Sequence, residues 1–349
     1  MDPLVRRRGM TLVEVVVLVV TLGLLLALIP ACVVGAREAA RRATCINNMK
    51  QLGLAFHNFH DAFKKLPPSS GVTRRKDGTI EAVDGWSFLV HLLPYMEYGS
   101  IYDALDVKKG YPDPGTDGDS SDTQKTAALV ARNTQLGELS CPSNPNSVFV
   151  NPAAKTGALT NYKAMGATHV ESLQVASPEP TTPLYDPQGT HPDGALFPGT
   201  ELKFSDFGRD GTANTILCVE TMDPKFGVWT VGAECTLVGL PSQGVTFEKY
   251  QDTYYAPGGF NGKYDDEAAP EVRSLKTYMA YDFANADPGP YAGTDPANTY
   301  GPSSGHPGVV NHLFADGTVR SLSKDTDFAF YMFLITRNGG DPTGQCCCD

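Results

Sequence analysis

Few histidine residues are placed where they could support chemistry. His306 and Asp316 flank one predicted strand, but the sequence has no Gly-x-Ser-x-Gly elbow and no His-Glu-x-x-His zinc helix beside which they could act. We therefore interpret Asp316 with Gly317 as a turn and His306 as the end of a loop, and we expect no enzymatic activity. His57 and His60 are three residues apart on a predicted helix, where contact with a sheet or loop is a simpler role than metal binding, which needs further ligands.

An acidic, flexible segment at residues 113–122 is a candidate for cation binding. Its carboxylates are Asp113, Asp117, Asp119 and Asp122. Calcium prefers such oxygen-rich loops, but the spacing is not that of an EF-hand, which ends in a glutamate. A solvated acidic loop is therefore the main interpretation, with calcium as the alternative, and we expect no other cofactor.

Another carboxylate, Glu14, stands directly before a long uncharged stretch. Residues 15–36 contain no charged side chain, and Thr21 is their one polar residue. About 20 apolar residues in a helix span a bilayer, so we predict a transmembrane segment over residues 10–36 rather than a buried core helix, which would show a polar stripe. A carboxylate in hydrocarbon is costly unless it is paired, so Glu14 either has a functional partner or reaches water at the interface.

The order of features at the N-terminus differs from that of a secretory signal. Arg6–Arg8 precede Gly9, which stands before the apolar run, whereas a secretory signal places its small residues after that run. This order resembles prepilins of type IV pili and type II secretion pseudopilins. The resemblance implies a leader over residues 1–9, cleavage by prepilin peptidase between Gly9 and Met10, and methylation of Met10. It also implies that Glu14, the fifth mature residue, pairs with the N-terminal amine of a neighbouring subunit, although Met10 replaces the family's usual phenylalanine.

Two other N-terminal signals compete with this interpretation. Residues 29–32 have the outline of a lipoprotein box with Cys32 as the lipidated residue, but Pro30 is unusual there. An uncleaved signal anchor is the second alternative, and three arginines on each side of the span leave its orientation open. The pilin resemblance favours a single-pass protein of the inner membrane with its globular domain outside the cytoplasm, at the membrane or the cell surface.

The helix is predicted to continue past the membrane. Apolar or small residues recur at gaps of three or four, the helical period, at Ala39, Ala43, Ile46, Met49, Leu52, Phe56, Phe59 and Phe63. The dipeptide Pro67-Pro68 stops it. We therefore expect one spine helix from about residue 10 to about residue 65, whose amphipathic half, residues 37–66, packs on the globular domain.

Short β-like runs follow the spine helix. Residues 215–219 and 227–231 are predicted strands, and residues 309–314 and 318–322 form a hairpin around an Asp-Gly turn. The predicted fold is α+β, with a long N-terminal helix on an antiparallel β-rich domain that has long loops. We place this domain at residues 67–340.

A second resemblance covers the chain from end to end. The sequence is similar to the DUF1559 family of pilin-like proteins, which are abundant in planctomycetes. The motifs that carry it, in order, lie at residues 36–42, 45–61, 66–68, 85–86, 92–97, 141–143, 160–162, 210–215, 306–308 and 314–319. The family is named for its unknown function, so the resemblance implies the architecture and no activity.

The eight cysteines suggest disulfides, because an exported domain folds in an oxidising compartment. The sequence does not fix the connectivity. Our hypothesis is a Cys45–Cys141 bond that ties the helix to the domain, and a second bond between Cys218 and Cys235. For the Cys-rich tail at residues 341–349, cross-linking, metal capture and no role at all remain open.

Charge restricts the partners. The net charge of −11 and the pI of about 5.1 argue against nucleic acid, which needs clustered basic residues. The expected partners are the membrane, prepilin peptidase and like or related pilin subunits. The sequence thus predicts a pilin-like or pseudopilin-like structural protein, with a membrane-anchored binding module for a solute, glycan or surface polymer as the alternative.

Overall fold

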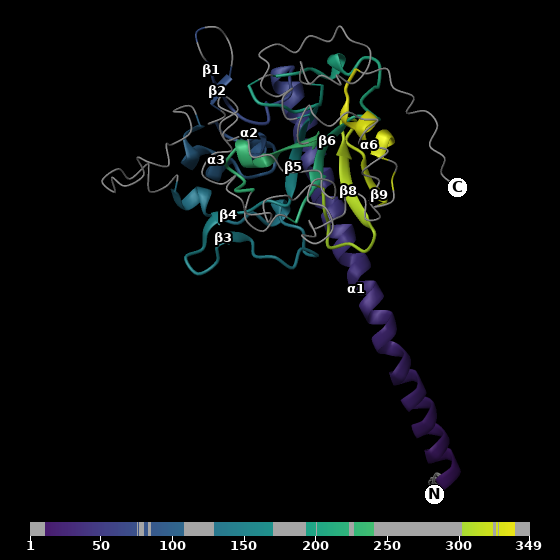
Figure 1. Ribbon diagram of the computed structural model, residues 1–349. Coiled ribbons are helices and arrows are strands. Elements are labelled where there is room, and N and C mark those ends of the chain that lie inside the picture. The colour runs from purple at the N-terminus through teal and green to yellow at the C-terminus, as the bar shows by residue number, and fades with distance from the viewer. Residues whose placement is uncertain are drawn as a thin grey trace, which may run out of the picture.

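A single long helix, α1, forms the N-terminal part of the structure and runs from Leu12 to Phe63 (Figure 1). The computed structural model describes residues 11–74, 76, 80–82, 85–107, 129–169, 193–199, 201–222, 227–240, 302–323, 326 and 328–338. The helix ends at Lys64, whose left-handed φ of 59° lets its N–H bond the His60 carbonyl before Pro67 and Pro68. The predicted spine helix is therefore confirmed to within two residues at each end.

A capping box begins α1. Thr11 Oγ1 accepts a bond from the backbone N–H of Glu14 at 3.3 Å, and the backbone N–H of Thr11 donates to Glu14 Oε2 at 2.7 Å. This reciprocal pair satisfies two of the backbone donors that a helix N-terminus leaves open. Glu14 thus has a local partner in this chain, which neither sequence interpretation of the residue included.

The first half of α1 projects away from the rest of the molecule (Figure 1). Large apolar side chains are exposed there, at Leu12, Val13, Val15, Val16, Val17, Leu18, Val19, Val20 and Leu22. In the part of the chain that the structure describes, no helix has the length and apolar character of a membrane span. The side chains of residues 24–34, within the predicted span, lie outside that part.

A five-stranded sheet organises the globular domain, in the order β7-β5-β6-β8-β9. Its strands are β5 (Tyr162–His169), β6 (Ile216–Glu220), β7 (Thr236–Leu240), β8 (Val309–Phe314) and β9 (Val319–Ser323). All pairs are antiparallel except β5 with β7, which is parallel. The α+β class and the mainly antiparallel pairing are supported, and the parallel β5–β7 pair makes the sheet mixed.

Smaller elements surround this sheet. The two-stranded pairs are β1 (Thr73–Arg74) with β2 (Ile80–Ala82), and β3 (Phe149–Asn151) with β4 (Thr156–Ala158). The short helices are α2 (Phe88–Leu92), η1 (Leu93–Tyr95), α3 (Gly99–Leu105), η3 (Gly137–Leu139), η5 (Phe204–Asp206), η6 (Ala233–Cys235) and α6 (Phe328–Ile335).

Two hydrophobic clusters lie on opposite faces of the sheet. The second half of α1 contributes Leu52 and Phe56 to the first, where they pack with Leu217 of β6 and Leu313 of β8. Val219 belongs to the second cluster, which α6 covers with its buried side chains Tyr331, Met332, Leu334 and Ile335. Side chains alternate across a strand, and the consecutive residues Cys218 and Val219 of β6 accordingly belong to the first and the second cluster. The spine helix is thus held by the domain core.

The predicted hairpin is confirmed, since β8 and β9 pair antiparallel around residues 315–317 and Gly317 takes the positive φ of 82°. The predicted strand at residues 215–219 is confirmed as β6. The predicted strand at residues 227–231 is wrong. Val228 and Val231 form single bridges, and a turn joins them because Glu234 Oε2 accepts the N–H groups of both Gly227 and Val228.

Candidate functional site

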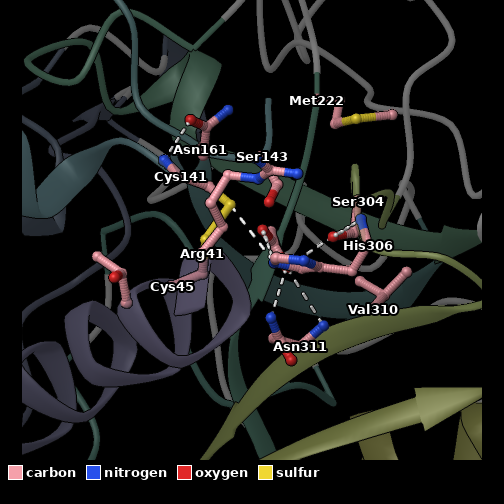
Figure 2. Close-up of polar contacts among 12 residues, drawn as sticks. Arg41, Cys45, Cys141, Ser143, Asn161, Met222, Ser304, His306, Val310 and Asn311 are labelled. Carbon is pink, nitrogen blue, oxygen red and sulfur yellow. Dashed lines mark hydrogen bonds and ion pairs between the residues drawn. A yellow bond between two sulfur atoms is a disulfide. The ribbon is translucent and has the colours of Figure 1, made fainter. Parts of the chain in front are cut away.

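Five side chains meet where α1 leaves the domain, and we call them the His306 cluster. They are Glu38 and Cys45 of α1, Cys141, Glu220 and His306. Glu38 and Cys45 lie seven residues, or about two helical turns, apart, and so share one face of the helix. Cys141 follows η3, Glu220 ends β6 and His306 precedes β8. Figure 2 shows Cys45, Cys141 and His306 close together.

A disulfide joins Cys45 to Cys141, with the two Cα atoms 5.2 Å apart. The backbone N–H of Cys141 donates to Asn161 Oδ1 at 2.8 Å, and Asn161 Nδ2 donates to the carbonyl of Thr221 at 2.9 Å. The predicted bond between the spine helix and the domain is therefore confirmed. Through Asn161, Cys141 is also fixed to Thr221, the residue that follows β6.

The ring of His306 is fully buried between two carboxylates. Its Nδ1 lies 2.7 Å from Glu38 Oε1. Its Nε2 lies 3.6 Å from both Cys141 Sγ and Glu220 Oε1. The bond from His306 lowers the pKa of Glu38 below its usual value, and Arg41 adds to the effect while burial opposes it.

These contacts define the tautomer of His306. Because Glu38 is held as a carboxylate, it can only accept a hydrogen bond, so Nδ1 carries the proton that it shares with Glu38. In the neutral ring, the lone pair of Nε2 then faces Cys141 and Glu220. This nitrogen is the one available for chemistry.

Glu220 is buried with its two oxygens in different surroundings. Oε2 accepts from Ser304 Oγ at 3.0 Å and from Asn311 Nδ2 at 2.9 Å. Oε1 is buried and has no hydrogen-bond partner. Burial raises the pKa of Glu220, although His306, Ser304 and Asn311 oppose the shift. A buried carboxylate oxygen without a hydrogen bond is costly, and this one points into the cluster.

A glycine permits the loop that carries His306 to approach Cys141. A Cβ added to Gly305 would lie 2.0 Å from the carbonyl oxygen of Ser143. That separation is far below van der Waals contact, so a side chain at this position would push the two loops apart. Gly305 therefore belongs to the structure of the cluster.

The structure separates the histidine–aspartate pair that the sequence suggested. His306 and Asp316 lie beyond opposite ends of β8, whose six residues span about 20 Å. Asp316 Oδ1 accepts from the N–H and the hydroxyl of Thr318 at 2.8 and 2.7 Å, which confirms its turn role. The interpretation of His306 as a loop end without chemistry was incomplete, because it is the centre of the cluster.

The spine histidines make the contacts that we expected. The rings of His57 and His60 lie 4.7 and 4.5 Å, centroid to centroid, from the ring of Phe204 in η5. They therefore fix a loop element against α1.

The predicted Cys218–Cys235 bond is wrong, since both are buried free thiols. Ala164 of β5 pairs with Cys218 on one side and with Thr236 on the other. Two strand spacings, about 9.5 Å, thus separate the backbones near these cysteines, whereas a disulfide needs Cα atoms within about 7 Å.

Several predicted site residues lie outside the described residues. These are Gly9, Met10, the calcium candidates Asp113, Asp117, Asp119 and Asp122, and the tail cysteines Cys346–Cys348.

The chain belongs to the family described as "Protein of unknown function (DUF1559)", whose model matches residues 35–329. All five members of the His306 cluster fall within the matched residues, whereas the predicted leader and most of the predicted span precede them. No curated protein and no solved structure matches the chain.

Proposed function

We propose that the protein is a membrane-anchored, pilin-like structural protein that assembles with like subunits through its N-terminal helix. The observation that carries this proposal is the double role of α1. Its second half packs in the core beneath the sheet, while its first half projects from the domain with exposed apolar side chains (Figure 1).

The projecting half needs apolar surroundings. Side chains at consecutive positions, from Val15 to Val20, are exposed, and consecutive helix residues point about 100° apart, so the apolar surface surrounds the helix. A helix that is hydrophobic all round is normally buried in lipid or protein. The sequence continues uncharged to Ala36, which supports a span in the membrane and packing against like helices in an assembly.

The disulfide supports a position outside the cytoplasm. Bonds such as Cys45–Cys141 form and persist in oxidising compartments. In this proposal Arg6–Arg8 remain inside, prepilin peptidase cuts between Gly9 and Met10, and residues 37 onward are exposed outside the membrane.

The N-terminal mass of the mature protein, purified from its native membrane, tests this proposal. We expect a chain that begins at methylated Met10. A substitution of Gly9 by leucine is the matched change, and it should leave the leader attached while the domain still folds. A mature chain that begins at lipidated Cys32 or retains Met1 would overturn the proposal.

No specific observation on the described residues favours the alternative function, a binding module. The composition predicts long surface loops at residues 103–125, 176–194 and 284–305, and most of these residues lie outside the described part of the chain. The structural role is therefore the function that we propose.

A further inference from the structure

The His306 cluster contains the donor set of a metal site, although its two sulfurs are bonded to each other. Cys45 Sγ, Cys141 Sγ, His306 Nε2 and a carboxylate oxygen of Glu220 all lie within 4.8 Å of one another, and all four residues are buried. Two thiolates, an imidazole and a carboxylate form a set that favours zinc among the common divalent ions.

We propose that reduction of the Cys45–Cys141 disulfide converts the His306 cluster into a four-coordinate zinc site. Its ligands are Cys45 Sγ, Cys141 Sγ, His306 Nε2 and Glu220 Oε1. Glu38 is the positioning residue that orients His306. The same side chains then connect the spine helix to the domain by a covalent bond in the oxidised state and by coordination in the reduced state.

The distances fit such a site. A tetrahedral zinc ion with bonds of about 2.0–2.3 Å holds its ligand atoms about 3.3–3.8 Å apart. His306 Nε2 already lies 3.6 Å from Cys141 Sγ and 3.6 Å from Glu220 Oε1. Once the S–S bond is broken, the sulfurs need to separate by less than 2 Å to reach a similar spacing.

Two further observations point to a ligand. Glu220 Oε1 is a buried acceptor without a hydrogen bond, and it faces Nε2 of His306. The other nitrogen of His306 is hydrogen-bonded to the carboxylate of Glu38. This is the arrangement by which a histidine ligand of zinc is usually oriented, with one nitrogen on the metal and its N–H on a carboxylate.

A dithiol reductant transfers two electrons and two protons to the S–S bond, which breaks to give two thiols, while the dithiol closes to its own disulfide. Zn²⁺ then replaces the two thiol protons and binds both thiolates, the neutral Nε2 and the carboxylate. The site is reachable, because Glu38 and Arg41 at its rim have side chains that are 25% and 44% exposed.

The test uses the full-length chain in detergent micelles, with Cys32 and Cys346–Cys348 replaced by serine so that they cannot bind metal. A phosphine reduces the protein, since it takes up oxygen from water and adds no competing thiol. Co²⁺ alone reports tetrahedral thiolate coordination by its visible spectrum, and Zn²⁺ affinity is measured by competition with a chromophoric chelator.

We expect one metal ion per reduced chain and at least 100-fold weaker binding by the oxidised chain. His306→Ala and Glu220→Gln should each weaken binding by at least tenfold. Glu38→Gln, which changes a partly exposed side chain at the rim, should weaken it by about 10–100-fold. His57→Gln, on the same helix but stacked on Phe204, is the matched control and should leave the affinity unchanged.

Absence of stoichiometric binding after reduction would overturn the proposal. Equal affinities for the parent, Glu38→Gln and Glu220→Gln would also overturn it, because the bound metal would then lie elsewhere. Neither result bears on the mature N-terminus, so this test is independent of the proposed function.

Discussion

Nδ1 of His306 lies 2.7 Å from Oε1 of Glu38, and this contact joins two residues that are 268 positions apart in the sequence. Glu38 belongs to α1, whose first half projects from the domain (Figure 1), and His306 precedes β8. Together with the neighbouring disulfide, the contact fixes the base of the projecting helix. The contact and the disulfide thus hold α1 to the domain at this point.

The Glu38–His306 contact predicts a pH dependence of stability. The pKa of Glu38 is lowered in the folded state, chiefly by His306, so its ionised form stabilises the fold above the ordinary value of 4.5. This contribution is lost as the pH falls below that value. In thermal unfolding from pH 7 to pH 3, Glu38→Gln should be less stable than the parent at pH 7 and should converge with it in acid. A difference that does not change with pH would contradict this assignment.

The disulfide is predicted to contribute a large part of the domain's stability. It closes a loop of 96 residues, for which chain entropy gives about 4–5 kcal/mol and measured losses are about 2–5 kcal/mol. The double substitution Cys45→Ser with Cys141→Ser should lower the free energy of unfolding by that amount in denaturant titrations. With metal chelated, a reductant should destabilise the parent similarly and leave the double variant unchanged. An equal effect on both proteins would show that other cysteines are responsible.

Packing of α1 on the sheet can be tested with two leucines of the same helix. Leu52 is fully buried in the first hydrophobic cluster, whereas Leu54 is 62% exposed. Leu52→Ala should cost about 2–5 kcal/mol of unfolding free energy, while Leu54→Ala should change it by less than about 0.5 kcal/mol. Equal effects in denaturant titrations would mean that the helix face is assigned wrongly.

The sequence was sufficient for features that depend on local patterns. The spine helix follows from apolar residues at gaps of three and four and a Pro-Pro stop, and the β8–β9 hairpin follows from its Asp-Gly turn. The run at residues 227–231 has the same β-like composition as β6 but forms a turn, because Glu234 binds the backbone N–H groups of Gly227 and Val228. Such a side-chain contact overrides strand propensity and has no local signature.

Most of the candidate site could not be predicted from the sequence. Cys45 and Cys141 were paired correctly, but Glu38 and Glu220 carried no signal that linked them to His306, since the tertiary fold alone brings them together. The Thr-x-x-Glu pattern of Thr11 and Glu14 is a known helix-start signature. This local signal indicates the cap, and the interpretation of the carboxylate as a membrane residue leaves it out.

Gly305 is predicted to be essential for the geometry of the His306 cluster. A Cβ there would collide with the carbonyl of Ser143, whereas a Cβ on Gly137 would meet nothing within 4 Å. Gly305→Ala should therefore destabilise the fold by about 1–3 kcal/mol and make Cys45 and Cys141 easier to reduce, as measured by thiol labelling at increasing dithiol concentration. Gly137→Ala, the matched control, should leave the labelling unchanged. Identical labelling of both variants would contradict the close approach.

The last prediction separates the two roles of Glu14. In the structure its carboxylate caps α1 by accepting the N–H of Thr11, and in the proposed assembly its charge pairs with the Met10 amine of a neighbouring subunit. Glutamine can still make the cap bond but carries no charge. Glu14→Gln should therefore abolish chemical cross-linking between subunits in the membrane, while the unfolding of the globular domain stays unchanged.

Thr11→Ala is the matched control, because it removes the hydroxyl of the capping box and leaves the charge of Glu14. It should weaken the helix start by about 0.5–2 kcal/mol and still allow cross-linking. If Glu14→Gln assembles like the parent, the carboxylate serves the cap alone and charge pairing is wrong. If both variants lose assembly, the subunits need both the charge of Glu14 and an ordered helix start, since glutamine keeps the cap bond and Thr11→Ala keeps the charge.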